Sequence, residues 1–242
     1  MSALPGESRG DESDYRAYLR REWEESYRHP AHLAAVDAIR RHVPSIARVL
    51  DVGMGAGQEL IPFLGDAWCC GIDIAEASPQ FARERLTAMA GPTLRFAVAQ
   101  ASVEALPFAP GSIDVVICRL VLPYVNHTAA LGELARVLRP GGILSLQVHA
   151  PRFYISKLRQ GIATRDAGKR RHAIGALRTG VWFHLTGRHR PIAGVIETFV
   201  TIRMLTRLAG RAGLDVIDQV ENQNPNAPHL LLKRRFDEEP RP

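Results

Sequence analysis

Three glycines that follow a short apolar run are the residues best placed to hold a ligand. In the stretch RVLDVGMGAGQE, Gly53, Gly55 and Gly57 come soon after Asp51. Glycine tolerates positive φ and leaves the main chain open to close approach by a bound molecule. If a strand ends here and a helix follows, the N–H groups at the helix start add partial positive charge. This pattern favours the binding of a polar ligand by the backbone, although a tight turn without a ligand is the alternative.

The spacing of the glycines indicates which nucleotide ligand to expect. A nicotinamide-binding pattern G-x-G-x-x-G would place its third glycine at position 58, which is a glutamine. A second acid, Asp73, ends the run WCCGID and lies 20 residues after Gly53. A carboxylate at that place in a doubly wound fold accepts hydrogen bonds from ribose hydroxyls. The residues therefore favour a nucleoside-containing ligand other than a nicotinamide dinucleotide.

Alternating strand-like and helix-like segments must position these residues. Apolar runs predict five buried strands, at 47–52, 67–74, 93–99, 113–118 and 143–148. Apolar spacing predicts helices between them, at 31–43, 58–64, 78–90 (with Ser78 as its N-cap) and 129–138. A helix over 202–213, capped by Thr201, and strands over 214–220 and 228–235 complete the pattern. We expect an α/β fold: a doubly wound, Rossmann-like sheet of seven mostly parallel strands with a helical insertion after the fifth.

Composition limits the other possibilities. The 242 residues, 46% of them hydrophobic and 23% charged, suit one globular domain with an insertion. No apolar run approaches the ~20 residues of a membrane helix, and the N-terminal residues do not resemble a signal peptide. Three cysteines, at 69, 70 and 118, form neither a disulfide framework nor a metal-binding pattern, so we expect no metal and a cytoplasmic protein.

Five stretches in order resemble the class I S-adenosylmethionine-dependent methyltransferases, of the small-molecule "type 11" kind. They are LDVGMGAG, GIDIAEASPQFAR, VEALPF, SIDVVIC and RVLRPGG, and they cover roughly residues 45–150. The resemblance implies S-adenosyl-L-methionine as the cofactor. It divides the chain into an N-terminal tail and cap segment (1–30), a cofactor-binding core (31–149), a basic lid insertion (150–200), the C-terminal part of the core (201–236) and a tail (237–242).

The same resemblance assigns cofactor contacts to residues at the ends of the strands. It implies that Asp51 holds the amino group, that Asp73 holds the ribose and that Ile74 covers one face of the adenine. The remaining contacts fall on Gly53, Met54, Gly55 and Gly57 near the methionine portion, Ser102 and Val103 at the adenine edge, and Cys118 or Arg119 at the methionine end. Ser102 departs from the family, which usually has Asp or Asn there.

Catalytic residues are less constrained by the resemblance. Methyl transfer from a sulfonium is an in-line displacement, so alignment of the acceptor matters most, and a base is needed only if the acceptor must lose a proton. The candidates are His149 as a base, with Arg119 and Tyr124 to bind or orient the acceptor. His149 is equally well interpreted as a strand-end histidine bonded to main chain, and His127 is better interpreted as a helix cap.

Two segments outside the core could complete the site. Between Arg152 and Arg190 there are ten Lys or Arg and one acid, Asp166. We rank a lid over an anionic or amphiphilic small molecule first; an anionic lipid surface, a nucleic-acid groove and a merely solvated insertion remain open. Near the N-terminus, the aromatic residues Tyr15, Tyr18, Trp23 and Tyr27 would either cap the pocket or rest on the core.

The expected function is therefore methyl transfer to a small-molecule acceptor, at oxygen or carbon. Two alternatives stay open. One is methylation of RNA or another macromolecule, which is not favoured because the NPPY-type sequence of base-nitrogen methylation is absent; the chain has CRLVLPYVN after the fourth strand. The other is a cofactor-binding regulatory protein without transferase activity. The basic insertion could also contact a membrane surface, and such a contact is compatible with methyl transfer to a small molecule.

Overall fold

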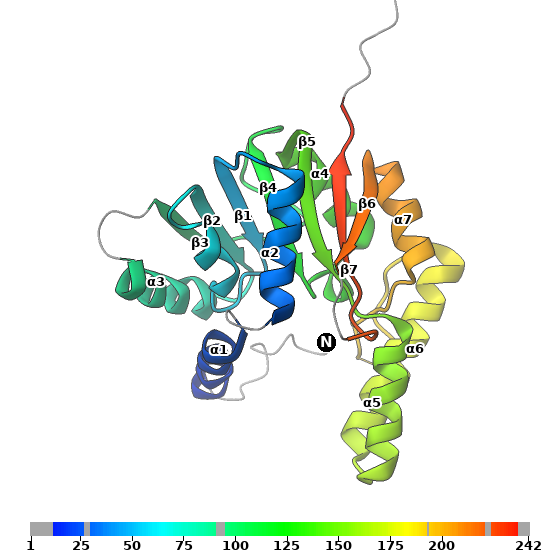
Figure 1. Cartoon of the computed structure of the whole chain (residues 1–242). Helices are drawn as coiled ribbons and strands as arrows, with labels where there is room; N and C mark the ends of the chain where they lie inside the picture. The colour runs from blue at the N-terminus through cyan, green and yellow to red at the C-terminus, as the bar shows by residue number, and fades with distance from the viewer. Residues whose placement is uncertain (1–11, 27–29, 91–94, 193, 221–223, 237–242) are drawn as a thin grey trace, which may run out of the picture.

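A computed structural model describes residues 12–26, 30–90, 95–192, 194–220 and 224–236. Its centre is a seven-stranded sheet in the order β3-β2-β1-β4-β5-β7-β6 (Figure 1). The strands are β1 Arg48–Val52, β2 Trp68–Asp73, β3 Phe96–Gln100, β4 Ile113–Arg119, β5 Leu138–Gln147, β6 Leu214–Val220 and β7 His229–Arg234. β7 pairs antiparallel with β5 and β6, and the other pairs are parallel. The predicted fold class is confirmed.

Helices cover both faces of the sheet and extend beyond its edge. The α-helices are α1 Glu12–Ser26, α2 Pro30–His42, α3 Ala77–Ala90, α4 His127–Val137, α5 Pro151–Ala163, α6 Ala167–Thr186 and α7 Ile202–Arg211. Side-chain caps fix three of their starts: Asn126 for α4, Asp166 for α6 and Thr201 for α7. Each cap oxygen accepts from a main-chain N–H of the first turn, which would otherwise lack a partner.

Three local predictions differ from the structure. The segment after the glycines is a 3-10 helix, η1 (Gln58–Phe63), rather than an α-helix, and Pro62 inside it cannot donate a main-chain hydrogen bond. Ser78 is not the cap of α3, because the helix already begins at Ala77. The fifth strand, expected at 143–148, begins earlier: β5 starts at Leu138 and includes Gly141, which takes a positive φ of 76°.

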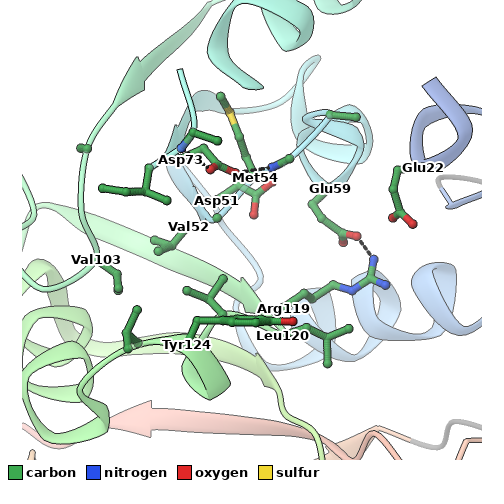
Figure 2. A pocket seen from close by; sticks show the side chains of 18 of the residues that line it. Glu22, Asp51, Val52, Met54, Glu59, Asp73, Val103, Arg119, Leu120 and Tyr124 are labelled. Carbon is green, nitrogen blue, oxygen red and sulfur yellow. Dashed lines mark hydrogen bonds and ion pairs between the residues drawn. The ribbon is translucent and has the colours of Figure 1, made fainter. Parts of the chain in front are cut away.

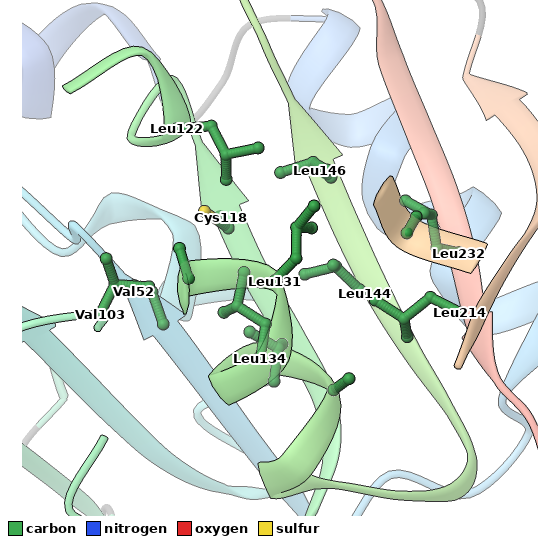
Figure 3. Close-up of a cluster of buried hydrophobic side chains, with 14 of the residues drawn as sticks. Val52, Val103, Cys118, Leu122, Leu131, Leu134, Leu144, Leu146, Leu214 and Leu232 are labelled. Atoms are coloured by element: carbon green, nitrogen blue, oxygen red, sulfur yellow. The ribbon is translucent and has the colours of Figure 1, made fainter. Parts of the chain in front are cut away.

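Alternation along the strands divides the core into two layers. On β1, Val49 faces one layer with α2, η1 and α3, whereas Leu50 and Val52 face the other layer. The second layer lies under α4 and α7, and Figure 3 shows its leucines from β5, β7 and α4 packed together. Both faces are apolar because the sheet is covered on both sides, so the central strands read as continuous apolar runs.

The chain order reverses between β1 and β4, and this reversal locates the ligand site. β2 and β3 lie on one side of β1, and the chain then crosses to place β4 on the other side. In open α/β sheets, ligands bind at such a switch point, beyond the carboxyl ends of the strands. The glycines follow β1 and Arg119 ends β4, so both lie at this place. Figure 1 shows α1 and α5 projecting from the same end of the molecule.

Candidate functional site

A cavity of about 410 Å³ opens at the switch point. Its walls come from the loops after β1, β2, β3 and β4, and α1 covers it from the other side. Most of the site residues predicted from the sequence line it: Asp51, Gly53, Met54, Gly55, Asp73, Ile74, Ser102, Val103, Arg119, Tyr124 and His149. Gly57 and Cys118 do not line it. Cys118 is instead fully buried in the core, in the cluster under α4.

The loop after β1 requires glycine for steric reasons. Gly53 has φ 67°, and a Cβ added there would lie 2.2 Å from Val121 Cγ2. Its N–H and that of Met54 both donate to Ile72 O on β2, at 2.8 and 3.0 Å. Gly57, at φ 82°, allows the chain to turn but does not line the cavity, and a Cβ added there would contact Ala82. Only glycine fits this loop at these angles.

Asp73 organises the loops around the ribose position implied by the resemblance. Its Oδ2 accepts from Gly55 N and its Oδ1 from Ala75 N, both at 2.9 Å. Burial raises the pKa of Asp73, and these two hydrogen bonds oppose the rise. An ionised carboxylate has about four acceptor positions, so two remain for hydroxyl groups of a ligand.

Asp51 is a buried carboxylate with acceptor capacity left over. It is 1% exposed, and among the described residues its Oδ2 has no hydrogen-bond partner. Burial raises its pKa to about 7, and the nearby Arg119 guanidinium opposes the rise. Gln58, also buried in the cavity wall, has an equally unpartnered Oε1 within the described part of the chain. Buried acceptors without partners are costly, so both atoms suit a ligand that donates hydrogen bonds.

Arg119 is already paired and so is not free to bind an anion. Its guanidinium forms an ion pair with Glu59 on η1, which Figure 2 shows as a dashed line, and its Nε donates to Gln147 Oε1 at 3.1 Å. His32 Nδ1 lies 2.7 Å from the other Glu59 oxygen, and burial lowers the pKa of His32 to about 4. The sequence reasoning missed Glu59, although it immediately follows the glycine stretch.

A second buried network holds Tyr124 at the cavity wall. Its hydroxyl donates to Glu197 Oε1 at 3.0 Å, and His172 Nε2 lies 2.9 Å from Glu197 Oε2. Burial works to raise the pKa of Glu197, but His172, Lys157 and Tyr124 outweigh it and the pKa is lowered. No sequence motif pointed to Glu197, because it is separated from Tyr124 by 73 residues.

The Tyr124–Glu197 hydrogen bond makes a measurable contribution to stability. We expect Tyr124→Phe and Glu197→Gln each to lower the free energy of unfolding, with a coupling energy of about 1 kcal/mol in a double-mutant cycle. Chemical denaturation of the wild type, both single variants and the double variant gives this value. Additive effects of the two substitutions would show that the hydrogen bond contributes nothing.

The surroundings of His149 fit the predicted role as a base only in part. Its ring lines the cavity and stacks on Phe153, with centroids 3.8 Å apart and planes 5° apart. Tyr154 Oη lies 3.5 Å from its Nδ1, so its nearest polar neighbour is a side chain and not the main chain. Burial lowers the pKa of His149 to about 4, so the ring is neutral at pH 7. A neutral ring can accept a proton, though as a weak base.

Aromatic residues of α1 line the cavity. Tyr15 and Tyr18 stack on each other, and the Tyr15 hydroxyl lies 2.9 Å from Ser78 Oγ. Leu19 fixes the helix over the glycine loop, because it is fully buried against Ala56 and Phe81. Tyr15, Tyr18 and Glu22 thus form the wall opposite the sheet. Trp23 packs against the core, and Tyr27 lies outside the described residues.

The basic insertion is helical, but the described part of it does not reach the cavity. It forms α5 and α6 and the segment up to Val200, and none of its described residues is in the cavity wall. It acts on the wall only through contacts such as that of Glu197 with Tyr124. His127 is not a helix cap: Asn126 caps α4, and the His127 ring is fully buried, stacked on Phe183 of α6 at 4.5 Å.

Acidic groups outnumber basic ones in the cavity wall. Glu22, Asp51, Glu59 and Asp73 face a single guanidinium, that of Arg119. Figure 2 shows Asp51 and Asp73 together on one side, with Arg119 and Tyr124 across from them. Such a wall attracts a cationic ligand and repels the pyrophosphate of a dinucleotide. At the remaining end, Ile74, Ser102 and Val103 offer an apolar slot with a hydroxyl at its edge.

Comparison with known proteins places residues 50–146 in a family model described as a methyltransferase domain. The uncharacterized methyltransferase YodH of Bacillus subtilis is 31% identical over 118 residues, which are 48% of this chain and 50% of that protein. The chain spans only 40–50% of the length of such curated relatives, which include an uncharacterized protein of Mycobacterium tuberculosis.

Solved structures share the fold over nearly the whole chain. The magnesium protoporphyrin IX methyltransferase of Synechocystis PCC 6803, solved with bound S-adenosylhomocysteine, superposes with a TM-score of 0.64 at 15% identity. It covers 92% of this chain and 94% of that one. The cyclase SpnF superposes with a TM-score of 0.60 at 16% identity over 98% of both chains. At such identities the likeness is one of fold, which hosts more than one reaction.

Proposed function

Because residues 50–146 form a methyltransferase domain, as the resemblance predicted, we propose that this chain binds S-adenosyl-L-methionine and methylates a small-molecule acceptor at oxygen or carbon. The observation that carries the proposal is the pair of buried carboxylates, Asp51 and Asp73, beside a glycine loop in an acidic cavity. A sulfonium and an ammonium group are both cations, and a ribose supplies two donors. Asp51 and Asp73 supply acceptors for the ammonium group and the ribose, and the excess of acidic groups in the wall suits the sulfonium.

Individual cavity residues would hold the ribose, the amino group and the adenine of the cofactor. The Asp73 carboxylate, anchored by Gly55 N and Ala75 N, holds the ribose hydroxyls with its remaining acceptor positions. The unpartnered oxygens of Asp51 and Gln58 accept from the amino group. Ile74 and Val103 cover the adenine. Gly57 and Cys118, which the resemblance had included, support the loop and the core and are left out of this proposal.

Bound S-adenosyl-L-methionine supplies a methyl group on a positively charged sulfur, which is already an activated leaving group. What the protein adds is alignment of the acceptor in line with the methyl carbon, together with a base if the acceptor must lose a proton. Tyr18, Tyr124 and His149 lie on the part of the wall left for the acceptor, with Leu120 and Val121 between them. Leu120 takes a left-handed conformation with φ 59°, which is strained for a leucine and recurs at ligand sites.

The wall favours an amphiphilic acceptor over a simple anion. Its acceptor part is aromatic and aliphatic, and its one guanidinium is engaged by Glu59. A negatively charged group of the acceptor would therefore lie outside the cavity, on the side of the basic insertion. The hypothesis that the insertion is a lid gains no support from the cavity wall, because none of the insertion's described residues lines it.

His149→Ala is expected to lower kcat about 100-fold if the acceptor must lose a proton, because positioned bases contribute factors of this size. The pKa of His149 lies at about 4, so the neutral, proton-accepting form dominates above this pH. Turnover should accordingly be flat from about pH 5.5 to 8 with respect to this group. Steady-state rates across this range check both points. Near-wild-type turnover of the variant would remove His149 as the base.

Transfer of labelled methyl from S-adenosyl-L-methionine to metabolites of a cell extract tests the proposed activity. Label in the organic-soluble, low-mass fraction supports a small amphiphilic acceptor. Label in RNA or protein would support the macromolecular alternative. Cofactor binding without any labelled product from repeated extracts would favour a regulatory protein.

A further inference from the structure

Helix α6 has a second apolar face that nothing in the described chain covers. Its inner face packs through Gly175, Ala176 and Gly180 against the segment that contains Val195 and Phe199. Its outer face carries Ile174, Val181 and Leu185, which are 44%, 52% and 80% exposed. An isolated exposed apolar residue is ordinary, but a continuous row on one helix marks an interaction surface.

The outer residues form one groove rather than scattered positions. An open groove of about 420 Å³ is lined by Ile174, Leu177, Arg178, Val181, Trp182, Leu185 and Ile192. From Ile174 to Leu185 the row extends about 16 Å along the helix, at the 1.5 Å rise per residue of an α-helix. It is separate from the cofactor cavity, with which it shares no residue.

Basic residues outnumber acidic ones along α6, whose N-cap Asp166 pairs with Lys169 at the far end from Leu185. Residues 167–192 contain six Lys or Arg and no Asp or Glu. Arg178 is part of the groove itself, and the Arg190 guanidinium lies 5.5 Å from the centre of the Trp182 ring at its edge. Arg171 and Arg188 are exposed on the same helix and just beyond its end. A partner must therefore offer both an apolar region and negative charge.

We propose that this groove docks on an anionic phospholipid bilayer. A helix with an exposed aliphatic row and arginines beside it is suited to lie against a headgroup layer, with that row among the acyl chains. Single-stranded RNA fits less well, because it binds by stacking on exposed aromatic rings. Here the exposed row is aliphatic, and the one aromatic ring, Trp182, already has Arg190 over it. The proposal does not depend on methyl transfer.

The test is sedimentation of the full chain with lipid vesicles. Wild type is expected to bind vesicles of phosphatidylcholine with about 30% phosphatidylglycerol at least about ten times better than pure phosphatidylcholine, and to release them at high salt. Leu185→Asp and Val181→Asp add a negative charge at exposed sites, so they should fold normally and lose about tenfold in vesicle binding. The matched control is Met89→Asp on α3, equally exposed at 52%, which should bind as wild type does.

Three results would overturn the proposal. One is the absence of wild-type binding to the anionic vesicles, and another is an equal loss in Met89→Asp. The third is unchanged binding in Leu185→Asp and Val181→Asp when their thermal unfolding matches that of wild type. If polyuridylate is bound by wild type and by Leu185→Asp alike and the vesicles are not, the basic surface belongs to nucleic acid instead. Binding of S-adenosylhomocysteine, measured on the same samples, reports on the proposed function separately.

Discussion

Asp73→Ala should weaken the binding of S-adenosylhomocysteine about 100-fold or more. The substitution removes two charge-assisted hydrogen bonds to the ribose, each contributing about 1.5–3 kcal/mol, and 100-fold corresponds to about 2.7 kcal/mol. It also leaves Gly55 N and Ala75 N without the acceptor that fixes the glycine loop. Calorimetric titration of wild type and variant measures the change directly.

A matched control separates loss of ligand contacts from general destabilisation. Asp114 also ties down main chain, accepting from Ala47 N at 2.9 Å and Arg48 N at 2.8 Å, but it lies at the start of the strands, away from the cavity. Asp114→Ala should lower stability and leave the affinity for S-adenosylhomocysteine as it is. If Asp73→Ala binds the ligand as wild type does, Asp73 does not hold the ribose.

Asp51→Asn should have opposite effects on binding and on stability. Burial raises the pKa of Asp51 from 3.8 to about 7, so the folded state holds its proton more tightly than the unfolded state does. The stability associated with this group is therefore present at low pH and is lost as pH rises from about 4 to about 7. An amide carries no charge, so the variant should be more stable than wild type at pH 8, by about 2 kcal/mol, and lose this advantage near pH 4. Denaturation at the two pH values checks this.

The same substitution should weaken ligand binding about tenfold or more, because the ammonium group loses its ionic partner. In wild type, a cation beside Asp51 favours the ionised carboxylate and lowers its pKa on binding. Affinity should therefore rise from pH 6 to about pH 7.5, with proton release, and Asp51→Asn should lack this pH dependence. A variant that binds as tightly as wild type with the same pH dependence would contradict the assignment of Asp51 to the amino group.

Local signals in the sequence were sufficient to predict that Asp51, the glycine loop and Asp73 lie close together. Asp51 is the last residue but one of β1, Gly53 follows this strand, and Asp73 ends β2, and parallel strands bring such positions to one edge of the sheet. Thr201 as the cap of α7 is an equally local signal, and the structure has it. Ser78 was misjudged because α3 begins one residue earlier, at Ala77, and its hydroxyl lies 2.9 Å from that of Tyr15.

Contacts between distant segments account for what the sequence reasoning missed. Glu59 reaches Arg119 across 60 residues, and Glu197 reaches Tyr124 across 73. His127 was predicted to be a helix cap from its position alone, whereas its ring stacks on Phe183 of α6. The lid role of the insertion stays a prediction: none of its described residues lines the cavity, and Arg178 lines the outer groove of α6.

We expect the acidic cavity to select S-adenosyl-L-methionine and its product over a phosphate-bearing nucleotide. The decisive experiment is calorimetric titration of wild type with S-adenosylhomocysteine and, separately, with NAD⁺. We expect micromolar binding of S-adenosylhomocysteine and no measurable binding of NAD⁺. Binding of NAD⁺ with no binding of S-adenosylhomocysteine would contradict it.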